Sequence, residues 1–116
     1  MIDQLSPTDF AEWRDAAAPK TAVVLDVREP WEVRTASVKA IGFTLLHVPM
    51  QSIPARMAEL KQQHGADQPM ACLCHHGIRS MHVANYLAQN GFTAVVNLQG
   101  GIQAWAEQVD PSMAQY

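Results

Sequence analysis

Short apolar segments that alternate with helix-like segments constrain the fold of this chain more than any other feature. The segment 21–27, Thr-Ala-Val-Val-Leu-Asp-Val, is rich in β-branched residues and almost continuously apolar. Such a run is typical of a strand that is buried on both faces, as in a parallel sheet. Further candidate strands cover 44–48, 70–74 and 93–98, and helix-like patterns separate them. This alternation predicts an α/β domain with a mostly parallel central sheet.

The helix-like patterns begin and end at residues that favour helix boundaries. Ser6 can cap a first helix that ends before Pro19, and Gly65 ends a longer helix that starts at Ile53. The segment 38–43 fits neither a helix nor a strand. The predicted helices are 6–17, a short turn within 29–36, 53–64, 80–90 and 102–109. The helix 80–90 is predicted to bury a face formed by Met81, Ala84, Leu87 and Ala88.

Length and composition exclude several classes of protein. The 116 residues predict a single domain over 1–116, and 48% apolar with 16% charged residues excludes a disordered chain. A net charge of -3 argues against a protein that binds nucleic-acid phosphates. No run approaches the roughly 18 apolar residues of a membrane span. Two cysteines that form no disulfide framework, with no visible export signal, predict a cytoplasmic protein.

The segment 70–80 carries the chemistry. An apolar strand ends at Cys74, and a short loop then leads into a helix. Loop N–H groups, the helix dipole and the charge of Arg79 all favour a thiolate, which is the nucleophilic form of cysteine. The alternative is that Cys74 is a small buried residue at a strand end. Gly77 and Arg79 at this spacing favour the nucleophile, whereas Cys72 lies inside the strand and is predicted to be inert packing.

The segment 74–80, Cys-His-His-Gly-Ile-Arg-Ser, resembles the active-site loop of the rhodanese family. The resemblance extends over nearly the whole chain. The other segments that resemble family motifs are 25–32, Val48-Pro49 and 97–105. The segment 110–116 also resembles the tail of rhodanese domains that are fused to enzymes activating sulfur-carrier proteins.

The resemblance implies a rhodanese-like fold, with a five-stranded parallel sheet and helices on both faces, and a sulfurtransferase activity. Cys74 would take a sulfane sulfur from a donor such as thiosulfate, hold it as a persulfide and pass it to cyanide, a thiol or a protein. Arg79 would help to bind the anionic donor, and Asp26 and Arg28 would brace the loop and the sheet. No cofactor is implied. The loop residues expected to surround the outer sulfur are His75, His76, Gly77, Ile78, Arg79 and Ser80.

The chain departs from the family pattern over 37–49. Family members usually carry Gly-His-Ile and Gly-Ala ahead of a strand that ends in Ile-Pro. The corresponding stretch here is longer and lacks that histidine. The departure leaves the Cys74 loop unchanged.

Two other functions are compared with sulfur transfer. Four residues separate Cys74 from Arg79, whereas cysteine phosphatases have five, and a smaller loop fits one sulfur atom better than a tetrahedral phosphate. This spacing disfavours a phosphatase or an arsenate reductase. A non-catalytic binding or regulatory module is the main alternative, and the presence of Cys74 argues against it. The expected partners are a small sulfur-donor anion and a small-thiol or protein acceptor, without nucleic acid or membrane.

Several remaining residues have structural interpretations. Two cysteines and two histidines crowd into 72–76, which is too compact for a metal site, so none is predicted. His75 and His76 are expected on a solvated rim. Gly100-Gly101 is predicted to form a tight turn into the last helix. Tryptophans expected in the core are Trp31 and Trp105, and glutamates expected on a solvated face are Glu29, Glu32 and Glu59.

Overall fold

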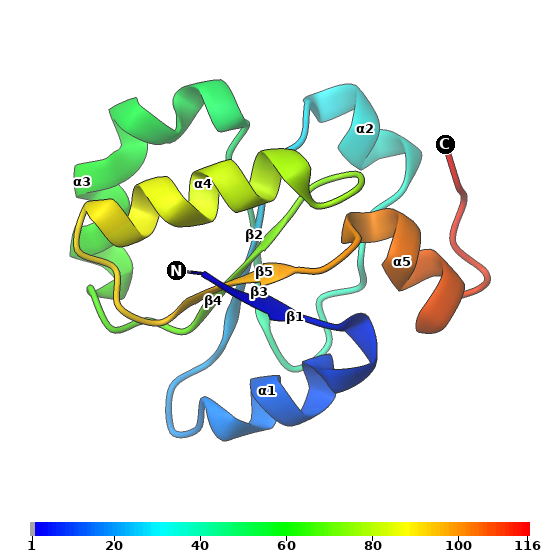
Figure 1. Cartoon of the computed structure of the whole chain (residues 1–116), viewed down its shortest axis with the longest axis horizontal. Helices are drawn as coiled ribbons and strands as arrows, with labels where there is room; N and C mark the ends of the chain where they lie inside the picture. Colours follow the sequence, from blue (N-terminus) through cyan, green and yellow to red (C-terminus); the bar gives the residue numbers. More distant parts are fainter. Residues whose placement is uncertain (1) are drawn as a thin grey trace.

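The structure is a computed structural model that describes residues 2–116, and it shows an α/β fold with a central sheet (Figure 1). Two short 3₁₀ helices, Pro7–Asp9 and Met50–Ser52, precede α1 and α3. The strands are β1 (Asp3–Leu5), β2 (Val23–Asp26), β3 (Thr44–His47), β4 (Met70–Leu73) and β5 (Val95–Leu98). The helices are α1 (Phe10–Ala16), α2 (Pro30–Thr35), α3 (Ile53–His64), α4 (Ile78–Gln89) and α5 (Gly101–Gln108).

The five strands form one sheet in the order β1-β5-β4-β2-β3, and every neighbouring pair is parallel. The predicted mostly parallel sheet is therefore confirmed, as is the five-stranded form that the family resemblance implied. β4 lies at the centre, between β5 and β2. Because parallel strands end at the same edge, the loops that follow β2, β4 and β5 lie side by side. In open α/β sheets this edge is where ligands bind.

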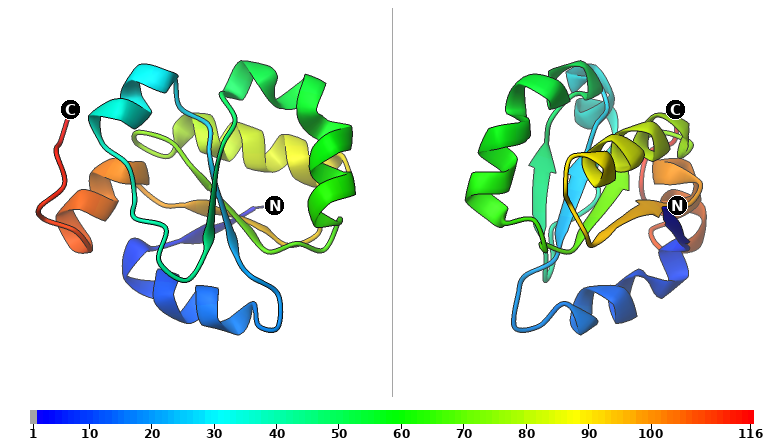
Figure 2. Two further views of the ribbon diagram at one scale, coloured as in Figure 1. Left: turned by 180° about the vertical axis from the view of Figure 1, so that it is seen from behind. Right: turned by 60° about the vertical axis from the view of Figure 1, so that its left-hand side comes forward.

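Helices cover both faces of the sheet (Figure 2). Val23 and Leu25 face a core that includes residues of α3 and α4, whereas Val24 faces a second core that includes residues of α1 and α5. All four residues of β2 are buried, as are all four of β4. Burial on both faces explains why 21–27 lacks the polar alternation of a strand with one wet face.

The predicted helix 6–17 is a 3₁₀ turn followed by α1, and α4 differs from its prediction at its start and on its inner face. α3 has the predicted bounds, 53–64. α4 begins at Ile78, two residues earlier than predicted, because Gly77 adopts a left-handed conformation and serves as its N-cap. The predicted buried face of α4 is wrong in part, since Ala88 is exposed. The buried residues of α4 are Ser80, Val83, Ala84 and Leu87.

The sequence pattern did not predict β1. This strand has three residues and pairs only with β5, with Gln4 opposite Asn97. A segment this short shows no periodicity, so its strand conformation depends on pairing with β5. The predicted cap at Ser6 is also wrong, because its hydroxyl contacts Thr8 instead of the helix backbone.

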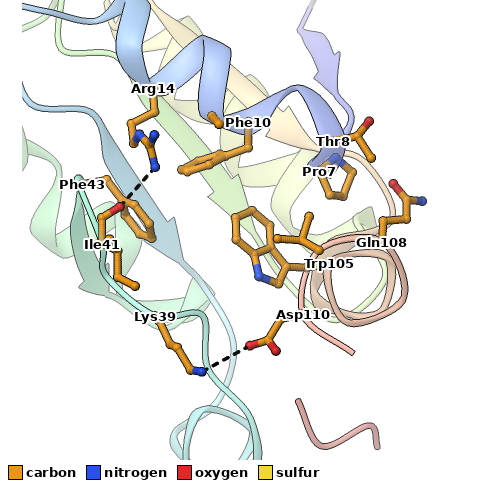
Figure 3. A pocket seen from close by; sticks show the side chains of 12 residues that line it. Pro7, Thr8, Phe10, Arg14, Lys39, Ile41, Phe43, Trp105, Gln108 and Asp110 are labelled. Carbon is orange, nitrogen blue, oxygen red and sulfur yellow. Dashed lines mark hydrogen bonds and ion pairs between the residues drawn. The ribbon is translucent and has the colours of Figure 1, made fainter. Parts of the chain in front are cut away.

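The segment that departs from the family pattern forms one wall of a groove (Figure 3). Residues 37–43 are irregular, with Phe43 buried and Ile41 69% exposed. The groove has a volume of about 630 Å³. Phe10 of α1 and Trp105 of α5 also line it, and their rings pack edge to face. None of its lining residues belongs to the loop 74–80. Within residues 2–116, no helix combines the length and the apolar composition needed to cross a bilayer.

Candidate active site

Cys74 lies directly after β4, at the centre of the carboxyl edge of the sheet. Its side chain is almost completely buried, and its Sγ accepts a hydrogen bond of 3.0 Å from the backbone N–H of Gly77. Gly77 has a φ of +99°, and a Cβ there would lie 3.1 Å from the backbone nitrogen of Gly100. A glycine is therefore needed both for the left-handed turn and for the close approach of the following loop. The turn directs a backbone donor at the sulfur.

Ser80 provides a second polar contact to the sulfur. Its Oγ lies 3.2 Å from Cys74 Sγ and 2.6 Å from Oδ1 of Asn97, a buried residue of β5. A hydroxyl has one proton, so Ser80 can donate to the sulfur or to Asn97, but not to both. The orientation of the Asn97 amide is also fixed, because its Nδ2 donates a hydrogen bond of 3.0 Å to the carbonyl of Gly77. A thiolate at Cys74 thus has one fixed donor and one switchable donor.

The N-terminus of α5 holds the Cys74 loop from the opposite side. The N–H of Ile102 donates to the Cys74 carbonyl at 2.9 Å, and the N–H of Gln103 donates to the His75 carbonyl at 3.1 Å. Gly101 has a φ of +62°, and a Cβ there would overlap both carbonyl oxygens. The predicted tight turn at Gly100-Gly101 is confirmed. Its physical reason is that α5 must approach the loop closely enough to bond its carbonyls.

Arg28 forms a buried ion pair beside this loop. Its guanidinium is fully buried and donates to the Asp26 carboxylate from Nε at 2.9 Å and from Nη2 at 2.7 Å. Asp26 is the last residue of β2, next to β4 in the sheet, and Arg28 follows two positions later. The remaining donors of Arg28 bind the carbonyls of Glu32 and Ala36 and the hydroxyl of Tyr116. This pair ties the end of β2 to α2 and to the C-terminal segment.

A second ion pair joins α2 to α4. Glu32 accepts two hydrogen bonds from Arg79, at 2.7 and 2.8 Å, and the Glu32 side chain is 4% exposed. Hydrogen bonding to Arg79 lowers the pKa of Glu32 to about 2. The same contact raises the pKa of Arg79, and the nearby Cys74 sulfur adds a smaller effect in the same direction. Arg79 therefore keeps its charge near the thiol while two of its five N–H groups are engaged by Glu32.

The rim of the site is formed by exposed and half-buried side chains of the same loop. The His75 and His76 rings stack at a centroid distance of 3.9 Å, and Ile78 is 70% exposed. Burial, and to a smaller extent the charge of His76, lower the pKa of His75. In contrast to these rim residues, Cys72 is completely buried, and burial raises the pKa of its thiol to about 12. Cys72 therefore remains a thiol at neutral pH.

Comparison with known proteins decides the family. The Rhodanese-like domain family matches residues 6–108. The chain belongs to this family. The predicted resemblance of the chain to the rhodanese family is thus confirmed.

Named sulfurtransferases are among the relatives of this rhodanese-like domain. It is 34% identical to a sulfurtransferase of Allochromatium vinosum over 84% of each chain, and 35% identical to the thiosulfate sulfurtransferase GlpE of Vibrio cholerae over 74% of each chain. These relatives support a rhodanese-type sulfurtransferase enzyme. The domain is also 35% identical over 91% of its length to the Rhodanese-like/PpiC domain-containing protein 12 of Arabidopsis thaliana, of which it covers 34%.

A solved structure supports the rhodanese-like fold. The crystal structure of a rhodanese-related protein from Thermoplasma volcanium has a TM-score of 0.75 and 28% sequence identity. The match covers 98% of this chain and 99% of that one.

Of three predictions for residues of α2 and α5, those for Glu32 and Trp31 are wrong, and that for Trp105 is confirmed. Glu32 does not lie on a solvated face, because it is 3% exposed and paired with Arg79. The sequence around Glu32 does not indicate burial, because Glu32 is a charged residue in a short helix, two positions after a proline. Trp31 does not lie in the core, because it is 56% exposed, whereas Trp105 is buried as predicted.

Three residues of the rhodanese-like site were not identified as site residues from the sequence. The sequence places Asn97 in a family motif and Tyr116 in the tail, and it predicts Glu32 on the surface. A buried asparagine or glutamate is a sign of a functional site. Burial depends on tertiary packing, however, and the sequence does not show which residues will be buried. Of the predicted loop residues, Gly77 and Ser80 contact the Cys74 sulfur.

Proposed function

We propose that this rhodanese-like domain transfers a sulfane sulfur from an anionic donor such as thiosulfate to a thiophilic acceptor through a persulfide on Cys74. The observation that carries the proposal is the placement of the Cys74 sulfur. It lies at the carboxyl edge of the sheet, with the Gly77 N–H at 3.0 Å and the Ser80 hydroxyl at 3.2 Å. Both donors favour an anionic sulfur at this position.

The first half-reaction forms the persulfide. The Cys74 thiolate attacks the outer sulfur of thiosulfate, a new S–S bond forms, and the bond between the two thiosulfate sulfurs breaks. Sulfite leaves with the electron pair of that bond. Arg79 supports this step because its charge attracts the dianionic donor.

The second half-reaction restores the thiolate. The acceptor, cyanide or a thiolate, attacks the outer sulfur, and Cys74 leaves with the electron pair of the S–S bond. Cys74 is 1% exposed, which favours an acceptor with a slender reactive end. A small anion, a small thiol or a thiol on a flexible segment of a protein fits this requirement.

The loop geometry favours sulfur transfer over phosphate hydrolysis. Four residues lie between Cys74 and Arg79, and the Gly77 N–H is directed at the sulfur itself. A phosphatase needs several N–H groups around a tetrahedral anion beyond its sulfur. We therefore favour a sulfane sulfur as the group transferred.

The proposal also covers compartment and partners. Both cysteines are free thiols, which suits a reducing compartment such as the cytoplasm. The partners we propose are a small sulfur-donor anion and a small-thiol or protein acceptor. A net charge of -3 gives no support to nucleic acid as a partner.

Turnover of thiosulfate with cyanide tests the proposal, with a small aryl phosphate as the comparison substrate. Incubation with thiosulfate alone should add the mass of one sulfur atom to the intact protein, and a reductant should remove it. Cys74→Ser should show neither turnover nor the added mass. Hydrolysis of the aryl phosphate without sulfur transfer would support the phosphatase, and inactivity in all assays would support a non-catalytic binding module.

A further inference from the structure

The segment after α5 returns to the active-site edge of the sheet and ends beside α2 (Figure 1, Figure 2). It brings the Tyr116 hydroxyl between the two ion pairs of the site. The hydroxyl accepts a hydrogen bond of 2.9 Å from Nη1 of Arg28 and donates one of 2.8 Å to Oε2 of Glu32. Tyr116 therefore links the Asp26–Arg28 pair to the Glu32–Arg79 pair.

The hydroxyl completes the hydrogen bonding of both charged partners. Arg28 has five N–H groups, and the Tyr116 oxygen is the acceptor for one of them, while the other four bind Asp26 and two carbonyls. The Glu32 carboxylate accepts four hydrogen bonds, two from Arg79, one from the N–H of Glu29 and one from Tyr116. Burial raises the pKa of Tyr116 to about 12, so the phenol keeps the proton that it donates.

The Tyr116 ring makes a separate contact with the Cys74 loop. It stacks on the His75 ring at a centroid distance of 3.9 Å and an interplanar angle of 15°. His76 stacks on His75 at the same distance, and the edge of Trp31 approaches Tyr116 at 5.7 Å. His75 directly follows Cys74, so the ring of Tyr116 restrains the residue next to the reactive sulfur.

We propose that Tyr116 is a positioning residue of the sulfur-transfer site, whose hydroxyl fixes the Glu32–Arg79 pair and whose ring fixes the Cys74 loop at His75. The proposal rests on the proposed function for the nature of the reaction. It assigns separate effects to the two parts of the side chain. The hydroxyl sets where the charge of Arg79 lies relative to an anionic donor, and the ring sets the geometry of the sulfur.

Two substitutions separate these effects. Tyr116→Phe keeps the ring and removes the hydroxyl, so it should raise KM for thiosulfate by about tenfold, the effect of one hydrogen bond to a charged group, with little change in kcat. Tyr116→Leu also removes the stacking partner of His75 and should lower kcat as well. Tyr86→Phe is the matched control, because Tyr86 lies on the outer face of α4 and its hydroxyl has no hydrogen-bond partner within residues 2–116.

Alkylation of Cys74 gives a measurement that does not depend on sulfur transfer. Iodoacetate is an anion and iodoacetamide is neutral, so the ratio of their rates reports the positive charge near the sulfur. Tyr116→Phe should lower this ratio several-fold, and Tyr86→Phe should leave it unchanged. Cys72 does not interfere, because it is completely buried and remains a thiol.

The outcomes distinguish the proposal from the function on which it rests. If the wild-type protein does not turn over thiosulfate, the proposed function fails, and the alkylation ratio still tests the role of Tyr116. Urea unfolding establishes that each variant is folded at the assay temperature. An unchanged KM and an unchanged ratio in folded Tyr116→Phe would overturn the proposal. An equal loss of both alkylation rates would also overturn it, since that result indicates a structural role alone.

Discussion

Replacing Glu32 with glutamine tests the energetic role of the ion pair between α2 and α4. Glutamine has nearly the same shape but no charge, so Arg79 loses its partner while the packing is kept. The Glu32 side chain is 4% exposed, and both of its oxygens contact Arg79, at 2.7 and 2.8 Å. A group this well enclosed is sensitive to the loss of one charge.

The pKa of Glu32 provides the magnitude. Hydrogen bonding to Arg79 lowers this pKa from 4.5 to about 2. At roughly 1.4 kcal/mol per pH unit, the ionised carboxylate contributes about 3 kcal/mol to the free energy of unfolding. Arg79 is 33% exposed, so solvent weakens the pair, and we expect a loss of about 2–3 kcal/mol for Glu32→Gln.

The dependence on pH follows from the direction of the change. Because the pKa of Glu32 is lower in the folded state, its contribution is complete above pH 4.5 and is lost as the pH falls toward 2. The difference in stability between wild type and Glu32→Gln should therefore be largest at neutral pH and should shrink between pH 4.5 and 2.

Urea unfolding at several pH values measures this difference. Glu59→Gln is the control, because Glu59 pairs with Arg56 at 3.2 Å on the surface of α3 and is 47% exposed. This control should change the free energy of unfolding by less than about 1 kcal/mol. If Glu32→Gln is as stable as Glu59→Gln at pH 7, or if the difference persists at pH 2, the reasoning from burial and pairing is wrong.

Three further predictions concern the thiols, the loop arginine and the turn before α5. Cys74→Ser should abolish sulfur transfer, whereas Cys72→Ser should keep activity and lose about 1–3 kcal/mol of stability, because it buries a hydroxyl in an apolar core; an inactive but folded Cys72→Ser would indicate a relay of two thiols. Arg79→Ala should weaken transition-state stabilisation for thiosulfate, as reported by kcat/KM in steady-state kinetics, by about 1.5–3 kcal/mol. An unchanged kcat/KM would mean that backbone N–H groups alone bind the donor. Gly101→Ala should destabilise the protein in thermal unfolding by about 3 kcal/mol or more, because its Cβ would overlap the carbonyl oxygens of Cys74 and His75. Gly42 has a similar positive φ of +79°, but the Cβ of Gly42→Ala would meet only the flexible Arg14 side chain at 3.2 Å, so this change should cost less, and equal losses would refute the role of close approach at Gly101.

Features that depend on contiguous residues could be predicted from the sequence. The apolar run at 21–27 predicted a strand buried on both faces, and the residues around Cys74 predicted a strand, a short loop and a helix in succession. These predictions succeed because backbone geometry links neighbouring residues directly. The observed bounds of α3 equal the predicted bounds, because Gly65, with its positive φ, ends the helix.

The identity of the distant residues around the loop could not be predicted from the sequence, because it depends on how the elements pack. Glu32 and Arg79 are 47 positions apart, and Tyr116 and Glu32 are 84 positions apart, yet both pairs are hydrogen-bonded. These contacts follow from the strand order β1-β5-β4-β2-β3, which places the ends of β2, β4 and β5 together. Periodicity describes which face of an element is buried, but not which elements become neighbours. The burial of Glu32, the strand conformation of β1 and the return of Tyr116 to Cys74 therefore emerge only when the sheet has been assembled.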